Sequence, residues 1–186
     1  MKDFPTDPRA EDLEAAYRRL LGEVPWTAEI YLPTNRISPA DKVAGMRRVS
    51  QIHNQRLETH YRPRLRSLRD RYAGTERCFI IGNGPSLNRT DLTQLAGEVT
   101  FSTNAFFLKM PELGWAPTFH VVEDHLVAED RACELNDLKG PTKIYPSYLG
   151  YCLDEAEDTI FLNHRARKSY PDGFDFSTDA SRVTYT

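Results

Sequence analysis

Long hydrophobic runs are absent from this chain. Its apolar stretches last only a few residues, whereas a helix needs about 20 apolar residues to cross a bilayer. Residues 1–8 have neither the basic region nor the apolar core of a secretory signal, so the sequence favours a cytoplasmic protein. Cysteine is scarce too: Cys78, Cys133 and Cys152 stand far apart, without a Cys-x-x-Cys pair. This spacing excludes a disulfide framework or a zinc site and indicates reduced thiols.

The composition is that of a folded domain with an uneven charge. The chain has 186 residues, of which 40% are hydrophobic and 27% charged, and this excludes disordered, collagen-like and disulfide-rich classes. Residues 1–75 hold 14 basic against 10 acidic side chains, and residues 76–186 hold 10 against 17. The net charge of −3 therefore combines a basic N-terminal part with an acidic C-terminal part.

The basic excess gathers on one predicted helix. Only Tyr61 and Tyr72 lie near it, whereas a nucleic-acid site would need stacking aromatics and a recognisable binding module. We therefore expect no nucleic-acid binding and a helix surface that is solvated or faces a partner. A homo-oligomer and a different partner both remain open. The basic residues are Arg56, Arg62, Arg64, Arg66, Arg69 and Arg71.

Residues 1–75 have the hydrophobic period of helices. One helix is predicted from Thr6 or Asp7 to Gly22, and a second begins in the segment 38–41, where a serine precedes a proline. Pro63 is expected to break this second helix. Two apolar stripes are expected to face the core, namely Val43, Met46, Val49 and Ile52 before the break, and Tyr61, Leu65, Leu68 and Tyr72 around it.

Residues 76–186 have a different pattern, in which short apolar runs alternate with helical stretches. This pattern predicts an α/β fold: a Rossmann-like, mostly parallel sheet that is buried on both faces and preceded by the helical segment 1–75. The predicted strands are Cys78–Ile81, Val99–Ser102, Phe119–Val122, Lys143–Tyr145 and Thr159–Leu162, and the predicted helical stretches are 91–96, 106–110 and 126–138.

The most informative segment is the loop after the first predicted strand, Gly82-Asn83-Gly84-Pro85-Ser86. Glycine and asparagine tolerate positive φ, and glycine lets a ligand approach the backbone. Pro85 suits the first turn of a helix, where amides and the Ser86 hydroxyl can bind an anion. The loop lacks the Gly-Lys-Ser/Thr ending of a P-loop and the third glycine of the dinucleotide fingerprint. Its spacing alone leaves a tight structural turn and a phosphate site both open.

The segment from Tyr72 to Asn88 resembles a group of bacterial and archaeal proteins. The group includes sialyltransferases of lipooligosaccharide synthesis, motility-associated flagellin glycosyltransferases and 6-hydroxymethylpterin diphosphokinase-like proteins. The resemblance is carried by the string Gly82 to Leu87 and continues through Phe101–Asn104 and Pro117–Asp124. It covers roughly residues 72–186 and does not choose among the members of the group.

The resemblance implies a site and a substrate class. In the sialyltransferases the loop cradles the cytidine monophosphate part of a CMP-activated sugar, which here implies Gly82, Asn83, Gly84, Pro85 and Ser86; the asparagine that ends the second strand also faces the donor, which implies Asn104. The expected function is that of a glycosyltransferase acting on a glycan or protein acceptor. For Asn104 alone, a helix cap is an equally good interpretation.

Asp124 is the other candidate, because it closes the third predicted strand. It could hold Mg²⁺ against a triphosphate or bind a ribose hydroxyl, or it could simply cap the following helix. The first role belongs to the alternative function, an ATP- and Mg²⁺-dependent diphosphotransferase. A non-catalytic nucleotide-binding or assembly module is a third possibility. No Asp-x-Asp motif occurs, and no His has metal-ligand spacing; His120 is expected in the core.

The catalytic histidine and the tyrosines of the sialyltransferases correspond to positions after Thr186. We therefore expect an N-terminal half that is truncated at its C-terminus, and the sequence offers no general base.

Overall fold

The computed structural model describes residues 39–164 and 182–183. The predicted helix that ends at Gly22 lies outside this part of the chain. Within it, no helix is long and apolar enough to cross a membrane.

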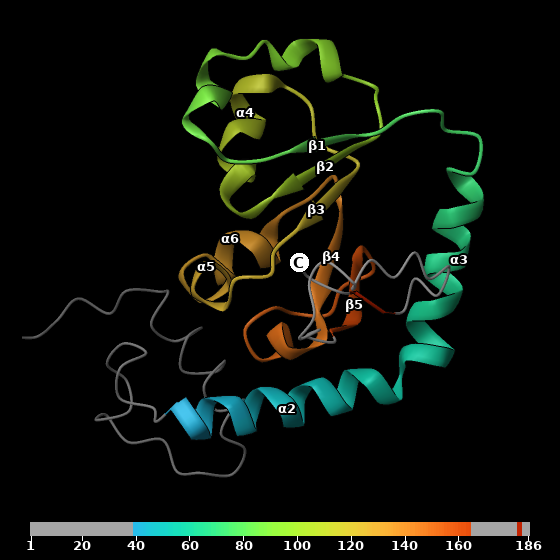
Figure 1. Ribbon diagram of the computed structural model, residues 1–186, viewed down its shortest axis with the longest axis vertical. Coiled ribbons are helices and arrows are strands. Elements are labelled where there is room, and N and C mark those ends of the chain that lie inside the picture. The colour runs from blue at the N-terminus through green and yellow to red at the C-terminus, as the bar shows by residue number, and fades with distance from the viewer. Residues whose placement is uncertain (1–38, 165–181, 184–186) are drawn as a thin grey trace, which may run out of the picture.

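Three consecutive helices form what we call the helical arm: α2 (Pro39–Gln55), the π-helix η1 (Leu57–Tyr61) and α3 (Arg62–Arg71). The helix start at Pro39 and the break before Pro63 are both confirmed. Pro63 stands in the first turn of α3, where no intrahelical donor is needed. The arm runs along the bottom of the sheet and then up its right side (Figure 1).

The two apolar stripes have different outcomes. Tyr61 is fully buried, and Leu65 and Leu68 pack against the core, so the second stripe is confirmed. In the first stripe Val49 is buried, but Val43 and Ile52 are 46% and 55% exposed, so the expectation for these two is wrong. The reason is geometric: each three-residue step falls about 60° short of a full helical turn, and a stripe built only from such steps rotates away from the core.

All five predicted strands are confirmed, and together they make an open, all-parallel sheet. Its strands follow one another in chain order, and a two-residue strand joins at the end. The strands are β1 (Phe79–Ile81), β2 (Thr100–Thr103), β3 (Phe119–Val121), β4 (Thr142–Pro146), β5 (Thr159–His164) and β6 (Arg182–Val183).

Short helices connect the strands. The helix expected at 126–138 is divided in two at Arg131. The connections are η2 (Pro85–Arg89) and η3 (Leu92–Leu95), then η4 (Asn104–Lys109) and α4 (Met110–Leu113), then α5 (His125–Asp130) and α6 (Ala132–Asp137), and finally η5 (Ser147–Tyr151).

The sequential strand order places the connections between the strands on one face of the sheet. Parallel crossovers are almost always right-handed, so strands added in one direction place their connections on the same face. That face is buried: Ile81 packs with Leu92 and Phe106, and the Phe107 ring meets His120 at a centroid distance of 6.2 Å. On the opposite face Ile80 is 79% exposed. The expectation of a sheet buried on both faces is therefore wrong at β1, but on the same face Phe119 of β3, which packs against Tyr72, and Ile160 of β5 are buried.

The helical arm and the sheet share one hydrophobic core. Val49, Leu57 and Tyr61 of the arm belong to the same buried cluster as Tyr145 and Phe161 of the sheet. The rings of Tyr61 and Phe161 meet edge to face, with centroids 6.1 Å apart. Burial of these side chains holds the arm against β5.

Candidate functional site

The loop Gly82–Ser86 leaves the carboxyl end of β1 and enters η2, and all five of its residues are exposed. Pro85 begins this helix, as expected, and Gly84 precedes it with an extended backbone. The helix is a 3₁₀-helix of only five residues. Any attraction for an anion therefore comes mainly from individual amides, since so short a helix has little dipole.

The two loop glycines are not required by the chain itself. Neither has positive φ; the left-handed glycines of the described part are Gly97, Gly114 and Gly140. A Cβ atom on Gly82 would meet nothing within 4 Å, and one on Gly84 would meet only the Ser86 hydroxyl, at an ordinary 3.7 Å. The expectation that these glycines supply positive φ angles is therefore wrong. The other reason for a glycine in this loop, that it lets a ligand approach the backbone closely, is not contradicted.

The loop also presents free backbone donors. The Leu87 amide donates to the Gly84 carbonyl at 2.9 Å. No backbone hydrogen bond among the described residues uses the amides of Asn83, Gly84 or Ser86. These three amides therefore point to a ligand or to water, because backbone donors rarely stay unpaired.

The structure brings the loop together with the end of β2. The Asn83 side-chain amide donates to the Thr103 carbonyl at 2.7 Å, so Asn83 braces the loop against the next strand. Asn104 follows with φ of 51°, the one non-glycine residue of the described part in the left-handed region. Its side chain makes no hydrogen bond within this part, and Thr103 precedes η4 in the capping position. The interpretation of Asn104 as a helix cap therefore fails.

Asp124 lies at the same edge but farther along. Its Oδ1 accepts from the Leu126 amide at 2.8 Å, which is the capping role that the sequence left open. Asp124 follows β3 by three residues, and β2 lies between β3 and β1. The structure therefore groups the loop with Asn104 and leaves Asp124 apart.

A tyrosine near Asp124 was missed by sequence analysis. Tyr148 follows β4, and its hydroxyl donates to the Glu123 carbonyl at 2.8 Å. Burial and the charges of Glu123 and Asp124 raise the pKa of Tyr148, and partial burial beside Asp124 raises the pKa of Glu123. A tyrosine directly after a strand is the only signal that could have marked it.

At the carboxyl edge of the sheet, one feature restricts the space for a ligand and another provides a cavity. The α2 helix lies against the ends of β4 and β5, where Ser50 bonds Ser147 at 2.7 Å and Asn54 bonds Asn163 at 3.2 Å. Beside the loop, a cavity of about 280 Å³ opens along β1. Its lining combines loop residues with apolar side chains: Phe79, Ile80, Ile81, Gly82, Gly84, Ser86, Leu87, Thr90, Leu92 and Leu95. A ligand can therefore combine the loop amides with an apolar surface.

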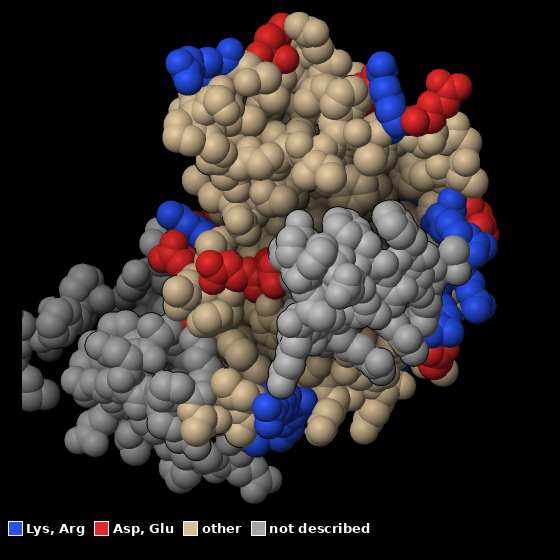
Figure 2. Space-filling view, in the orientation of Figure 1, with Lys and Arg blue, Asp and Glu red and all other residues tan. Residues whose placement is uncertain are grey.

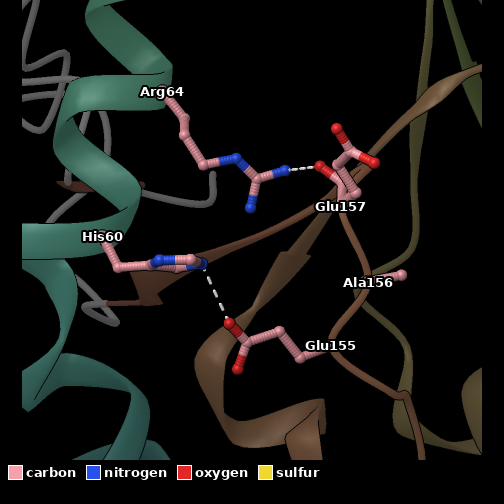
Figure 3. A pocket seen from close by; sticks show the side chains of 5 residues that line it. All are labelled: His60, Arg64, Glu155, Ala156 and Glu157. Atoms are coloured by element: carbon pink, nitrogen blue, oxygen red, sulfur yellow. Dashed lines mark hydrogen bonds and ion pairs between the residues drawn. The ribbon is translucent and has the colours of Figure 1, made fainter.

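A second cavity, of about 520 Å³, lies between the helical arm and the loop before β5 (Figure 3). Its charges are already paired: His60 meets Glu155 at 2.9 Å, Arg56 also pairs with Glu155, and Arg64 donates to the Thr159 carbonyl at 2.7 Å. Basic side chains line α3 on the right of Figure 2, where a few acidic ones lie among them. Part of the arginine stripe thus faces a partner within this same chain.

No group of three or more His, Cys, Asp or Glu side chains within residues 39–164 could hold a metal ion. His120 is fully buried, as expected for a core residue. Cys78 is exposed, Cys133 half-buried and Cys152 buried, and none of the three forms a disulfide.

Comparison with protein-family models, with curated proteins and with solved structures found no match to this chain. The fold and the site therefore define only a class of protein: an open, parallel α/β domain with an exposed glycine-containing loop at the carboxyl end of its first strand.

Proposed function

We propose that this chain is a glycosyltransferase-like domain that binds a nucleotide-activated sugar of the CMP-nonulosonate type. The donor's phosphate would lie on the loop Gly82–Ser86, with Asn104 beside it, and the acceptor would be a surface glycan or flagellin. The observation that carries the proposal is the loop: its amides at Asn83, Gly84 and Ser86 have no backbone partner among the described residues, and no contact or backbone angle there requires its two glycines. Successive backbone amides of such a loop can bind phosphate oxygens.

The surroundings of the loop support a nucleotide in particular. The cavity along β1 is walled by apolar side chains such as Phe79, Leu92 and Leu95, with the loop at one end. Small-molecule sites commonly combine an apolar lining with a few placed polar groups. A nucleobase or sugar can pack in this cavity while its phosphate meets the amides.

The diphosphotransferase alternative has less support. It needs Asp124 close to a triphosphate held by the loop, but Oδ1 of Asp124 is engaged by the Leu126 amide and the residue lies two strands away. We therefore rank it second. Three cysteines that form no disulfide agree with a reducing compartment, and we propose the cytoplasm as the location of the protein.

Thermal unfolding with added nucleotide tests the proposal. A ligand present at 100 times its dissociation constant adds about 2.7 kcal/mol of stability, so CMP without metal is expected to raise the unfolding temperature. Stabilisation by Mg-ATP alone would favour the diphosphotransferase. No response to either nucleotide would leave only the non-catalytic module.

Substitution of the loop sharpens the test. Gly82→Val should leave the stability of the free protein nearly unchanged, because no atom lies within 4 Å of the new Cβ position, but it should abolish the CMP response. Asn83→Leu should also abolish it by removing the brace to Thr103. Gly74→Ala is the matched control, since its Cβ position is equally open and it lies outside the loop. A CMP response that survives Gly82→Val would refute the placement of the phosphate.

A further inference from the structure

The outer edge of β1 is open beside the candidate loop. β1 is the first strand in the order of the sheet, and among the described strands it pairs only with β2. The Phe79 amide donates toward β2, to the Val99 carbonyl at 2.9 Å. Backbone groups of successive residues in a strand point alternately to its two sides, so the amide and the carbonyl of Ile80 point away from β2. No hydrogen bond between described residues occupies either group.

The cavity along β1 reaches this edge. Ile80 lines it together with Phe79 and Ile81. The Ile80 side chain points to the opposite face of the sheet from the side chains of these two neighbours, where it is 79% exposed. Ile80 therefore contributes its backbone to the cavity wall, which gives the wall a hydrogen-bond donor and an acceptor on one residue.

The size and position of the cavity suit the nucleoside part of a nucleotide. Its volume is about 280 Å³, at the lower limit of the roughly 300–1,000 Å³ of small-molecule sites, so it is too small for a whole activated sugar. Ile80 precedes Gly82 by two residues, which is about 7 Å along a strand. A phosphate on the loop and a base beside Ile80 can therefore belong to one nucleotide.

We propose that the Ile80 backbone recognises the base of the bound nucleotide. Its amide donates to a ring nitrogen of the base, and its carbonyl accepts from the exocyclic amino group next to that nitrogen. Cytosine offers this pair of groups at N3 and the 4-amino group, and adenine offers it at N1 and the 6-amino group. The inference deepens the proposed function and rests on it, because the phosphate on the loop is what brings the base to Ile80; the base is then the cytosine of the CMP part.

Amide hydrogen exchange in the wild-type protein is the first test. The Ile80 amide should exchange at least about tenfold more slowly when CMP is bound, because only then does it donate a hydrogen bond. The Phe79 amide is the internal control, since it already donates to Val99 in the free protein. An Ile80 amide that gains no protection while CMP is bound would overturn the proposal.

Calorimetric titration of two variants is the second test. Ile80→Pro removes the amide hydrogen but no bond to β2, and proline is tolerated where an amide faces outward from an edge strand. Ile80→Ala is the matched control, because it keeps the amide and shortens only the exposed side chain. The ligand control is 3-deaza-CMP, in which a C–H group replaces the N3 acceptor. The wild type and Ile80→Ala should bind CMP about fivefold more tightly than 3-deaza-CMP, which is the usual worth of one hydrogen bond, and Ile80→Pro should bind the two within about twofold.

The outcomes separate this inference from the proposed function. If CMP binds and Ile80→Pro prefers it over 3-deaza-CMP as strongly as the wild type does, the proposed function stands and the role of Ile80 is refuted. If the protein binds AMP but not CMP, and AMP protects the Ile80 amide, the CMP-sugar function fails while recognition of the base by Ile80 stands. If neither nucleotide binds, both proposals fail. If Ile80→Pro does not fold, the exchange rate of the Ile80 amide in the wild-type protein decides.

Discussion

The contact between α2 and η5 depends on one glycine. At Gly150 a Cβ atom would lie 2.6 Å from Cδ2 of His53, and closer still to Nε2. His53 cannot move aside cheaply, because its Nδ1 pairs with the Tyr61 hydroxyl at 3.0 Å and its ring packs on Phe161 with centroids 4.2 Å apart. We therefore expect Gly150→Ala to strain the place where the helical arm meets the sheet.

The magnitude follows from the overpacking of a filled interior. Forcing an extra carbon into a packed site costs about 1–3 kcal/mol. For a chain of this size such a loss lowers the unfolding temperature by about 2–12 °C. Urea unfolding followed by far-UV circular dichroism gives the free energy directly.

The control and the rescue make the prediction specific. Gly74→Ala, whose Cβ position is open, should stay within about 0.5 kcal/mol of the wild type. His53→Ala should remove most of the penalty of Gly150→Ala, giving a coupling of about 1 kcal/mol or more between the two sites. If Gly150→Ala is as stable as the wild type, or if the two changes are additive, the reasoning from the close approach of His53 is refuted.

Three further predictions concern pH, charge and thiols. Burial lowers the pKa of His120 from 6.5 to about 4 in the folded state, so the unfolded chain takes up a proton first as the pH falls. The free energy of unfolding should therefore decrease from pH 6.5 downward, by about 3 kcal/mol in all. Urea unfolding at pH 7 and pH 4.5 should show a smaller decrease in His120→Gln than in the wild type, and an equal decrease would contradict this. Glu155→Gln removes the ion pair with Arg56 and should cost about 0.5–1 kcal/mol, less at high salt; a gap that does not shrink with salt would argue against an electrostatic cause. Thiol labelling should modify the exposed Cys78 quickly and the buried Cys152 only after unfolding, and the reverse order would contradict the burial.

Much of the fold could be predicted from the sequence because it has a local cause. Each strand is a short apolar run bounded by turn residues, and Pro63 can stand only in the first turn of a regular helix, so a helix begins just before it. The position of the candidate loop at the carboxyl end of β1 could be predicted too, because the strand and the loop are adjacent in the sequence. These features depend on backbone preferences within a few neighbouring residues.

Other features were decided by contacts between distant parts of the chain. Arg56 and Glu155, Asn83 and Thr103, and His53 and Gly150 are brought together only when the sheet is assembled. The left-handed turn at Asn104 is of the same kind, since the Thr103 carbonyl before it is held by Asn83, which follows another strand. No local pattern encodes which strand lies beside which.

The apolar runs of this sequence are too short for a membrane-spanning helix, and their alternation with helical stretches predicted an α/β domain. The sequence by itself determined the helices, the strands and the position of the glycine-containing loop, because these follow from short-range periodicity and turn chemistry. The tertiary structure alone decided that the connections share one face of the sheet, that α2 closes the ends of β4 and β5, and that Asn104 rather than Asp124 lies beside the loop. Strand order and handed crossovers set these distances, and both are properties of the assembled sheet.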